Sequence, residues 1–184
     1  GRVTLINAAI KSENEMAGAS TGGLDQNASM RCTAGHALLL DCRPELTPLE
    51  NVSQQEFDLD KYNLELLVVD TQASHQLNDG QYAQRRATCE EAAKILGVAN
   101  LRVTADGISK ADDQFQALKE TLDALPDETM KKRVRHVVTE IERVRSFVRA
   151  FAQGDIKAAG RLFNASHDSL AADYEVTVPE LDIA

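Results

Sequence analysis

Aromatic residues and cysteines are scarce in this sequence. Its 184 residues include no tryptophan and only 4% aromatics, so a core must be built from leucine, valine, isoleucine and alanine. The three cysteines, Cys32, Cys42 and Cys89, lack a Cys-x-x-Cys spacing, which favours reduced thiols over a disulfide framework. There is no run of about 18 apolar residues and no charged-then-apolar leader, which argues against a spanning helix and a secretory signal. These absences predict a cytoplasmic protein without a membrane partner.

Basic residues are fewer than acidic residues. Lysine and arginine number 20 against 29 acidic residues, a net charge of -9. Nucleic-acid binding relies on clustered lysine and arginine, so no nucleic-acid partner is expected. The densest basic stretch, residues 131–135, shares a helical pattern with Glu140, Glu142, Arg143 and Arg145. Opposite charges at spacings of three and four predict a solvated, paired helix face rather than an anion-binding patch.

Short apolar runs predict a first third that is rich in strands. Residues 36–42 and 64–70 each carry a continuous apolar run followed by aspartate, at a length typical of a buried strand. Pro44 and Pro48 between them indicate turns. Residues 57–60 alternate polar and apolar side chains, which is compatible with a short third strand.

Helical periodicity dominates the rest of the chain. A first helix is predicted over about Leu5–Met16, and after residue 72 apolar residues recur at spacings of three and four. The later predicted helices cover residues 82–96, 114–125 and 129–152, and one that begins at residue 156. Gly154-Asp155 is predicted to end one helix and cap the next. This pattern indicates an α+β fold with a boundary near residue 72.

The most informative stretch is Gly22-Gly-Leu-Asp-Gln26. A backbone without Cβ atoms lets a small polar ligand come close, and Asp25 lies two residues after the second glycine, where it can point at such a ligand. The alternative is that the two glycines merely end a helix, which is a common use of glycine.

The histidines give no sign of a metal site. His36, His75, His136 and His167 are far apart in sequence, and no pair has the spacing of a zinc site, so no metal ligand is assigned. His136 and Glu140 lie one helical turn apart and are predicted to form a hydrogen bond on the helix surface.

An ordered series of motifs runs through the chain. The series consists of residues 13–26, His36-Ala-Leu-Leu-Leu-Asp-Cys-Arg43, Val68-Val-Asp-Thr71, Tyr82-Ala-Gln-Arg-Arg-Ala-Thr-Cys-Glu90, Arg135-His-Val-Val-Thr-Glu140, Ser166-His-Asp-Ser-Leu170 and Pro179-Glu-Leu-Asp182. In this order it resembles the middle of a galactokinase, a member of the GHMP kinases. The resemblance implies a GHMP-kinase-like α+β fold with large helical content. Residues 1–72 would end the N-terminal, ribosomal-S5-like domain, and residues 73–184 would form most of an incomplete, ferredoxin-like C-terminal domain.

The resemblance also implies an activity and a site. The activity is transfer of the ATP γ-phosphate to the anomeric hydroxyl of D-galactose, giving galactose 1-phosphate, with ATP and magnesium as cofactors. Asp25 would be the catalytic residue, either accepting the hydroxyl proton or holding the hydroxyl in place. Gly22 would line the sugar through its backbone, and Tyr82 would hydrogen-bond a sugar hydroxyl. Without the resemblance, Tyr82 reads as an ordinary half-buried helix tyrosine.

Three segments that the family uses do not occur in this sequence. These are an N-terminal arginine with a Gly-Glu-His-Thr-Asp motif, a Gly-Leu-Ser-Ser-Ser-Ala phosphate loop and a glycine-rich C-terminal segment. We therefore expect a central fragment that is inactive alone and has the remainder of the kinase chain as its partner, and no cofactor-binding residue is assigned. The alternatives are a kinase of another sugar, such as N-acetylgalactosamine, or of another metabolite, a non-catalytic galactose and ATP sensor, or a fragment serving only as a scaffold.

Overall fold

The structure is a computed structural model that describes residues 1–18, 22–43, 45–48, 50–73 and 80–184. The described residues fall into two compact units. The first contains residues up to Leu67, and the second contains residues 68–73 and 80–184.

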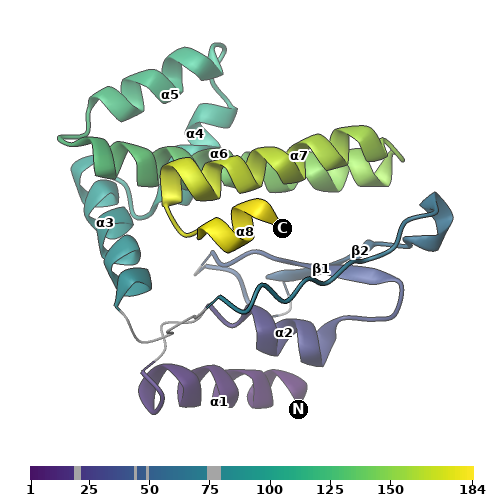
Figure 1. Cartoon of the computed structure of the whole chain (residues 1–184). Coiled ribbons are helices and arrows are strands. Elements are labelled where there is room, and N and C mark those ends of the chain that lie inside the picture. Colours follow the sequence, from purple (N-terminus) through teal and green to yellow (C-terminus); the bar gives the residue numbers. More distant parts are fainter. Residues whose placement is uncertain (19–21, 44, 49, 74–79) are drawn as a thin grey trace. The chain divides into compact units, whose positions relative to one another are not determined.

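The first unit contains two helices and a two-stranded sheet (Figure 1). Its elements are α1 (Arg2–Glu15), α2 (Leu24–Arg31), β1 (His36–Leu40), β2 (Val52–Glu56) and the 3₁₀ turn η1 (Asp60–Tyr62). The strands are antiparallel, with His36 opposite Glu56 and Leu40 opposite Val52. The predicted first helix and the predicted strand at residues 36–42 are both confirmed, the strand ending at Leu40.

The predicted strand at residues 64–70 is wrong. This segment is neither helix nor strand, and Leu66, Leu67 and Val68 are 78%, 84% and 82% exposed. A strand requires a neighbour that pairs with its N–H and C=O groups, and the described strands β1 and β2 pair with each other instead. The apolar pattern therefore identified a segment suited to a sheet, but pairing decides whether a strand forms.

The possible third strand at residues 57–60 is also not observed. The strand in this region, β2, ends at Glu56, and the chain then turns into η1. A carboxylate oxygen of Asp58 accepts a hydrogen bond from the backbone N–H of Lys61 at 3.3 Å, which favours a turn over an extended backbone.

The second unit is helical (Figure 1). Its elements are α3 (Gln81–Ile95), α4 (Leu101–Ser109), α5 (Gln114–Asp123), α6 (Glu128–Ala152), α7 (Ile156–Ser169), the π-helical turn η2 (Leu170–Tyr174) and α8 (Pro179–Ile183). The helices predicted at residues 82–96, 114–125 and 129–152 and from residue 156 are confirmed. The sequence reasoning missed α4, although its apolar residues lie on one face.

Four helices of this unit begin at residues whose side chains cap them. The side-chain oxygens of Asn100, Asp113, Asp127 and Asp155 accept hydrogen bonds from backbone N–H groups in the first turns of α4, α5, α6 and α7. Such a cap contributes about 1 kcal/mol. Gly154 has a φ of 72° after α6, as the predicted helix end at this position requires.

The core of the second unit surrounds α6. Val134 of α6 is fully buried and Val138 is 4% exposed. They pack with Ala92 and Ala93 of α3 and with Ala105 of α4, among other residues. Alanines on the facing helices permit close approach of the backbones, which suits a core without tryptophan. None of the helices in the described ranges has the length and apolarity needed to cross a bilayer.

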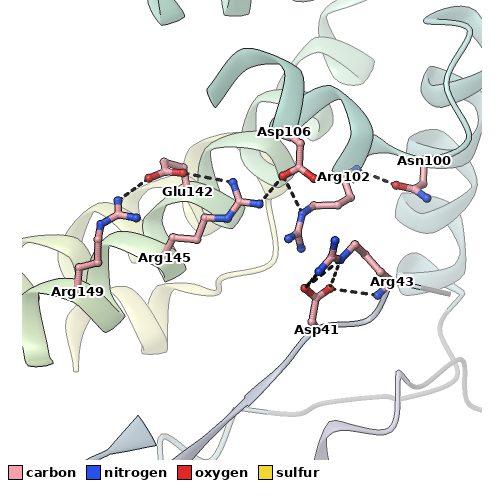
Figure 2. Close-up of polar contacts among 8 residues, drawn as sticks. All are labelled: Asp41, Arg43, Asn100, Arg102, Asp106, Glu142, Arg145 and Arg149. Atoms are coloured by element: carbon pink, nitrogen blue, oxygen red, sulfur yellow. Dashed lines mark hydrogen bonds and ion pairs between the residues drawn. The ribbon is translucent and has the colours of Figure 1, made fainter. Parts of the chain in front are cut away.

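Ion pairs join α4 to α6 on the surface of this unit (Figure 2). Asp106 of α4 accepts hydrogen bonds from Arg102, at 3.0 Å, and from Arg145 of α6. Glu142 in turn pairs with Arg145 at 3.5 Å and with Arg149 at 2.7 Å. The predicted paired face of α6 is therefore confirmed at this position. Figure 2 also draws an ion pair that lies within the first unit, between Asp41 and Arg43.

Candidate functional site

Asp25 lies in the first turn of α2 and is exposed. Since α1 ends at Glu15 and α2 begins at Leu24, the two glycines precede a helix and do not end one. A carboxylate is favoured at a helix N-terminus, where the backbone N–H groups carry partial positive charge. The position therefore favours a negatively charged side chain that is accessible from solvent.

The two glycines before Asp25 have different surroundings. Gly23 is the N-cap of α2 with φ of 80°, and a Cβ atom there would lie 2.3 Å from Cδ1 of Ile10 in α1. A side chain is therefore disfavoured by the backbone conformation, and it would also require the Ile10 side chain to move. Gly22 is exposed, and nothing lies within 4 Å of the place of its Cβ. The open space that a small ligand needs is therefore found at Gly22.

A buried asparagine fixes the start of α2. Asn27 is 5% exposed and donates from Nδ2 to the carbonyl oxygen of Gly23 at 2.8 Å. Its Oδ1 accepts from Arg31 at 3.2 Å, and Arg31 also donates to Oδ1 of Asn51 at 3.3 Å. These bonds connect the turn that carries Asp25 to the residue preceding β2. The sequence reasoning missed Asn27, although its spacing of four from Gly23 is the spacing of one helical turn.

A hollow of about 270 Å³ in the first unit includes Gly22 in its wall. Apolar side chains such as Ile6 and Ile10 form one part of its lining, and Asn27 and Arg31 contribute polar atoms. Asp25 is not among its lining residues, so the hollow reaches Gly22 but not the carboxylate.

Tyr82 lies in the first turn of α3, and its side chain is 54% exposed. Arg85, one turn further along, donates from Nε to the carbonyl oxygen of Tyr174 at 2.8 Å. Gly22 and Asp25 belong to the first unit and Tyr82 to the second. That these three residues form one site stays a prediction.

The basic stretch at residues 131–135 is not simply a solvated face. Arg133 is 7% exposed and donates to the backbone oxygen of Asp173 and, at 2.6 Å, to Oε2 of Glu175. Lys132 pairs with Glu175 at 3.1 Å, and Arg135 pairs with Asp173 at 2.7 Å. The hydrogen bonds from Arg133 and Lys132 lower the pKa of the Glu175 carboxyl. The prediction was wrong for Arg133, because the partner segment lies some 40 residues further along the chain.

The prediction for His136 was also wrong. Its side chain is buried, with Nδ1 2.9 Å from Oγ of Ser169 and the ring stacked on Tyr174 at a centroid distance of 4.5 Å. Burial is the main cause that lowers the pKa of His136. Glu140 instead accepts from Arg143 and from the hydroxyl of Ser166. Position 136 faces α7 and η2, which helical spacing alone does not reveal.

The described residues contain no group of three or more histidine, cysteine or acidic side chains that would hold a metal ion. His75 lies outside those residues, as do residues 19–21 of the first motif. Cys32, Cys42 and Cys89 carry free thiols.

Curated proteins similar to this chain are galactokinases. The galactokinase of Streptomyces coelicolor is 42% identical over 176 residues, which cover 94% of this chain and 41% of that protein. Those of Haemophilus influenzae and Mycobacterium bovis are each 38% identical, over 94% of this chain and 41% and 44% of their own lengths. The chain thus spans about two fifths of the length of these relatives. No family model matches the chain.

A solved structure with the same fold is that of Lactococcus lactis galactokinase complexed with galactose. It matches with a TM-score of 0.76 and 30% identity, over 99% of this chain and 44% of that one. The expected GHMP-kinase-like α+β fold with large helical content is therefore confirmed. The assignment of residues 1–72 and 73–184 to two kinase domains stays a prediction.

Proposed function

Because the chain is homologous to galactokinases over nearly its whole length, we propose that the protein containing it transfers the γ-phosphate of ATP to the anomeric hydroxyl of D-galactose. The product is galactose 1-phosphate, and the reaction takes place in the cytoplasm. The likeness to galactokinases over 94% of the chain is the observation that supports this proposal most strongly. Taken alone, this chain is inactive, because its sequence lacks a phosphate loop.

Asp25 acts on the hydroxyl that receives phosphorus. Phosphoryl transfer depends mainly on alignment of the acceptor oxygen and on neutralisation of developing charge. An exposed carboxylate in the first turn of α2 is free to accept a hydrogen bond from the sugar hydroxyl, and Asn27 holds that turn in place. Asp25 therefore positions the hydroxyl and can also accept its proton as the bond to phosphorus forms.

The sugar contacts come from both units of the chain. Gly22 presents an unobstructed backbone three residues before Asp25, and Tyr82 has an exposed side chain on the first turn of α3. A phenolic hydroxyl both donates and accepts, which suits a sugar hydroxyl. ATP supplies the phosphoryl group and magnesium neutralises its charge, and the residues that hold both lie in the remainder of the protein.

The test is the substitution Asp25→Asn in the full-length protein that contains this sequence. We expect kcat to fall about 100-fold or more, the usual range for loss of a general acid or base. The KM for galactose should stay within about tenfold, because the interaction is used mainly in the transition state. Asp123→Asn, at an exposed position of α5, is the matched control and should leave both parameters unchanged. An unchanged kcat in Asp25→Asn would defeat the assignment.

ADP release with a panel of sugars distinguishes the alternatives. Release with galactose and not with N-acetylgalactosamine supports the proposal, and the reverse preference identifies a kinase of a different sugar. Tight binding of galactose and ATP without ADP release identifies a sensor.

A further inference from the structure

We propose that Arg85 is a positioning residue for galactose recognition, because it fixes the first turn of α3 and with it Tyr82. This inference rests on the proposed function, in which Tyr82 contacts the sugar. All of the residues that carry it lie within the second unit.

The described residues at the start of α3 include no side-chain cap. Its N-cap is Gly80, which provides no side-chain hydrogen bond, and the first turn contains no acidic residue. The helices that follow, α4 to α7, each have an aspartate or asparagine cap. The first N–H groups of a helix have no partner within the helix, so contacts from elsewhere in the unit stabilise its first turn. Tyr82 lies in a turn of this kind.

Arg85 provides that attachment through two backbone carbonyls. Its Nε donates to the oxygen of Tyr174 at 2.8 Å, and its Nη2 donates to the oxygen of Glu175. The guanidinium also lies over the ring of Tyr174, 5.9 Å from its centroid. The planar fork of arginine reaches two carbonyls at once, which a lysine ammonium with its single nitrogen does less well.

The segment that receives Arg85 is itself held firmly. The ring of Tyr174 is stacked on His136 of α6, and Arg133 lies 5.8 Å from its centroid. The side chain of Glu175 is bonded to Arg133 and Lys132, although its φ of 54° is unusual for a residue other than glycine. These contacts tie residues 174–175 to α6, the central helix of the core. Arg85 thus connects the start of α3 to a rigid part of the unit.

Tyr82 lies on the same face of α3 as Arg85. Residues three apart on a helix are neighbours on its surface. Burial raises the pKa of Tyr174, and the charges of Cys89 and Tyr82 add to the increase, as expected if Tyr82 is near Tyr174. Loss of the Arg85 contacts would therefore release the turn beside Tyr82. The tyrosine would then have to be ordered again each time galactose binds.

The experiment compares Arg85→Met with Arg86→Met in the full-length protein. Arg86 is the matched control, because it is exposed and forms a surface ion pair with Glu90 at 2.9 Å. We expect Arg85→Met to raise the KM for galactose about tenfold, equivalent to loss of about 1.4 kcal/mol, with the KM for ATP unchanged. Arg86→Met should change neither value. Arg85→Lys, which keeps the charge and one donor group, should lie between wild type and Arg85→Met and is available if the methionine variant does not fold.

A double-substitution cycle with Tyr82→Phe separates positioning from general destabilisation. If Arg85 acts through the Tyr82 hydroxyl, then Arg85→Met should raise the KM for galactose far less in the Tyr82→Phe protein than in wild type. Equal increases in both backgrounds, or a parallel rise in the KM for ATP, would overturn the proposal. So would a Tyr82→Phe variant with an unaltered KM.

Hydrogen exchange gives a readout that does not depend on the reaction. Amides of residues 84–88 should exchange faster in Arg85→Met than in Arg86→Met, and equal rates would overturn the proposal. A wild-type protein that does not phosphorylate galactose would defeat the proposed function, while this exchange difference would still report on the attachment.

Discussion

The two units of this chain are stabilised in different ways. In the second unit, four helices begin at asparagine or aspartate caps and pack their apolar faces around α6. In the described part of the first unit, Ile6 is the one buried hydrophobic residue, the sheet has two strands, and Leu66 and Leu67 are exposed. Two paired strands alone are marginal in water. The comparison indicates that Gly22 and Asp25, the predicted catalytic and sugar-binding residues of the first unit, lie on the less self-sufficient part of the chain.

Hydrogen exchange on the 184-residue chain should show the largest difference between the two units. We expect backbone amides near Val134 to exchange at least about 100-fold more slowly than those of α2, because they open only when the core of the second unit opens. The measurement is exchange followed by mass spectrometry. Similar protection in both units would break the comparison and show that the first unit is stable by itself.

Val134→Ala should strongly destabilise the second unit. Removing two buried carbon atoms from this fully buried side chain should cost about 2 kcal/mol of the free energy of unfolding. Val144→Ala on the same helix is the control, since Val144 is 40% exposed and its loss should cost less than about 0.5 kcal/mol. Urea unfolding followed by circular dichroism measures both. Equal costs would mean that α6 is not the centre of the core.

Gly23→Ala tests the first unit. A positive φ with a side chain costs about 1–2 kcal/mol, and the added Cβ would also displace Ile10. Gly22→Ala meets no neighbouring atom and should cost less than about 0.5 kcal/mol. The opening free energy of the α2 amides, obtained from hydrogen exchange, is the quantity to compare. Should Gly22→Ala be the more damaging change, the positive φ of Gly23 and its contact with Ile10 do not limit the side chain at the start of α2.

Lowering the pH should destabilise the second unit slightly through His136. Burial lowers the pKa of this histidine, with Arg143 and Arg133 adding to the shift and Glu140 and Asp173 opposing it. The contribution of His136 to the free energy of unfolding is fully present above the pKa of about 6.5 that histidine has in the unfolded chain. This contribution is lost as the pH falls through the lower pKa that His136 has in the folded protein. The free energy of unfolding should therefore decrease from pH 8 to pH 5, and His136→Gln should reduce the decrease. An unchanged pH dependence in His136→Gln would show that other groups are responsible.

Local signals in the sequence predicted most of the second unit. The apolar stripe of α6 and the Gly154-Asp155 junction were read correctly, because helix periodicity and capping act over a few residues. Three of the failures involve distant partners. Residues 64–70 have no neighbouring strand to pair with among the described residues. Arg133 forms hydrogen bonds with Asp173 and Glu175, and His136 is buried beneath Ser169 and Tyr174.

The candidate site was predicted only in part. Motif order supplied Gly22, Asp25 and Tyr82 through the resemblance, and neither the buried Asn27 nor the Arg85 contacts were predicted. Both side chains donate to backbone carbonyls. Every residue has a backbone carbonyl, so the residue type does not show which one accepts the hydrogen bond. Supports of this kind become visible only when the atoms have been placed.

The sequence by itself determined most helices of the second unit, the resemblance to galactokinases and the residues proposed to contact the sugar. Those properties depend on spacing and residue type within short segments. Only the tertiary structure decided that Gly23 faces Ile10, that an apolar run remains unpaired and that Arg85 and Arg133 hold residues 173–175. The physical reason is that hydrogen-bond partners and buried neighbours are chosen in space, between residues that the chain separates by tens of positions.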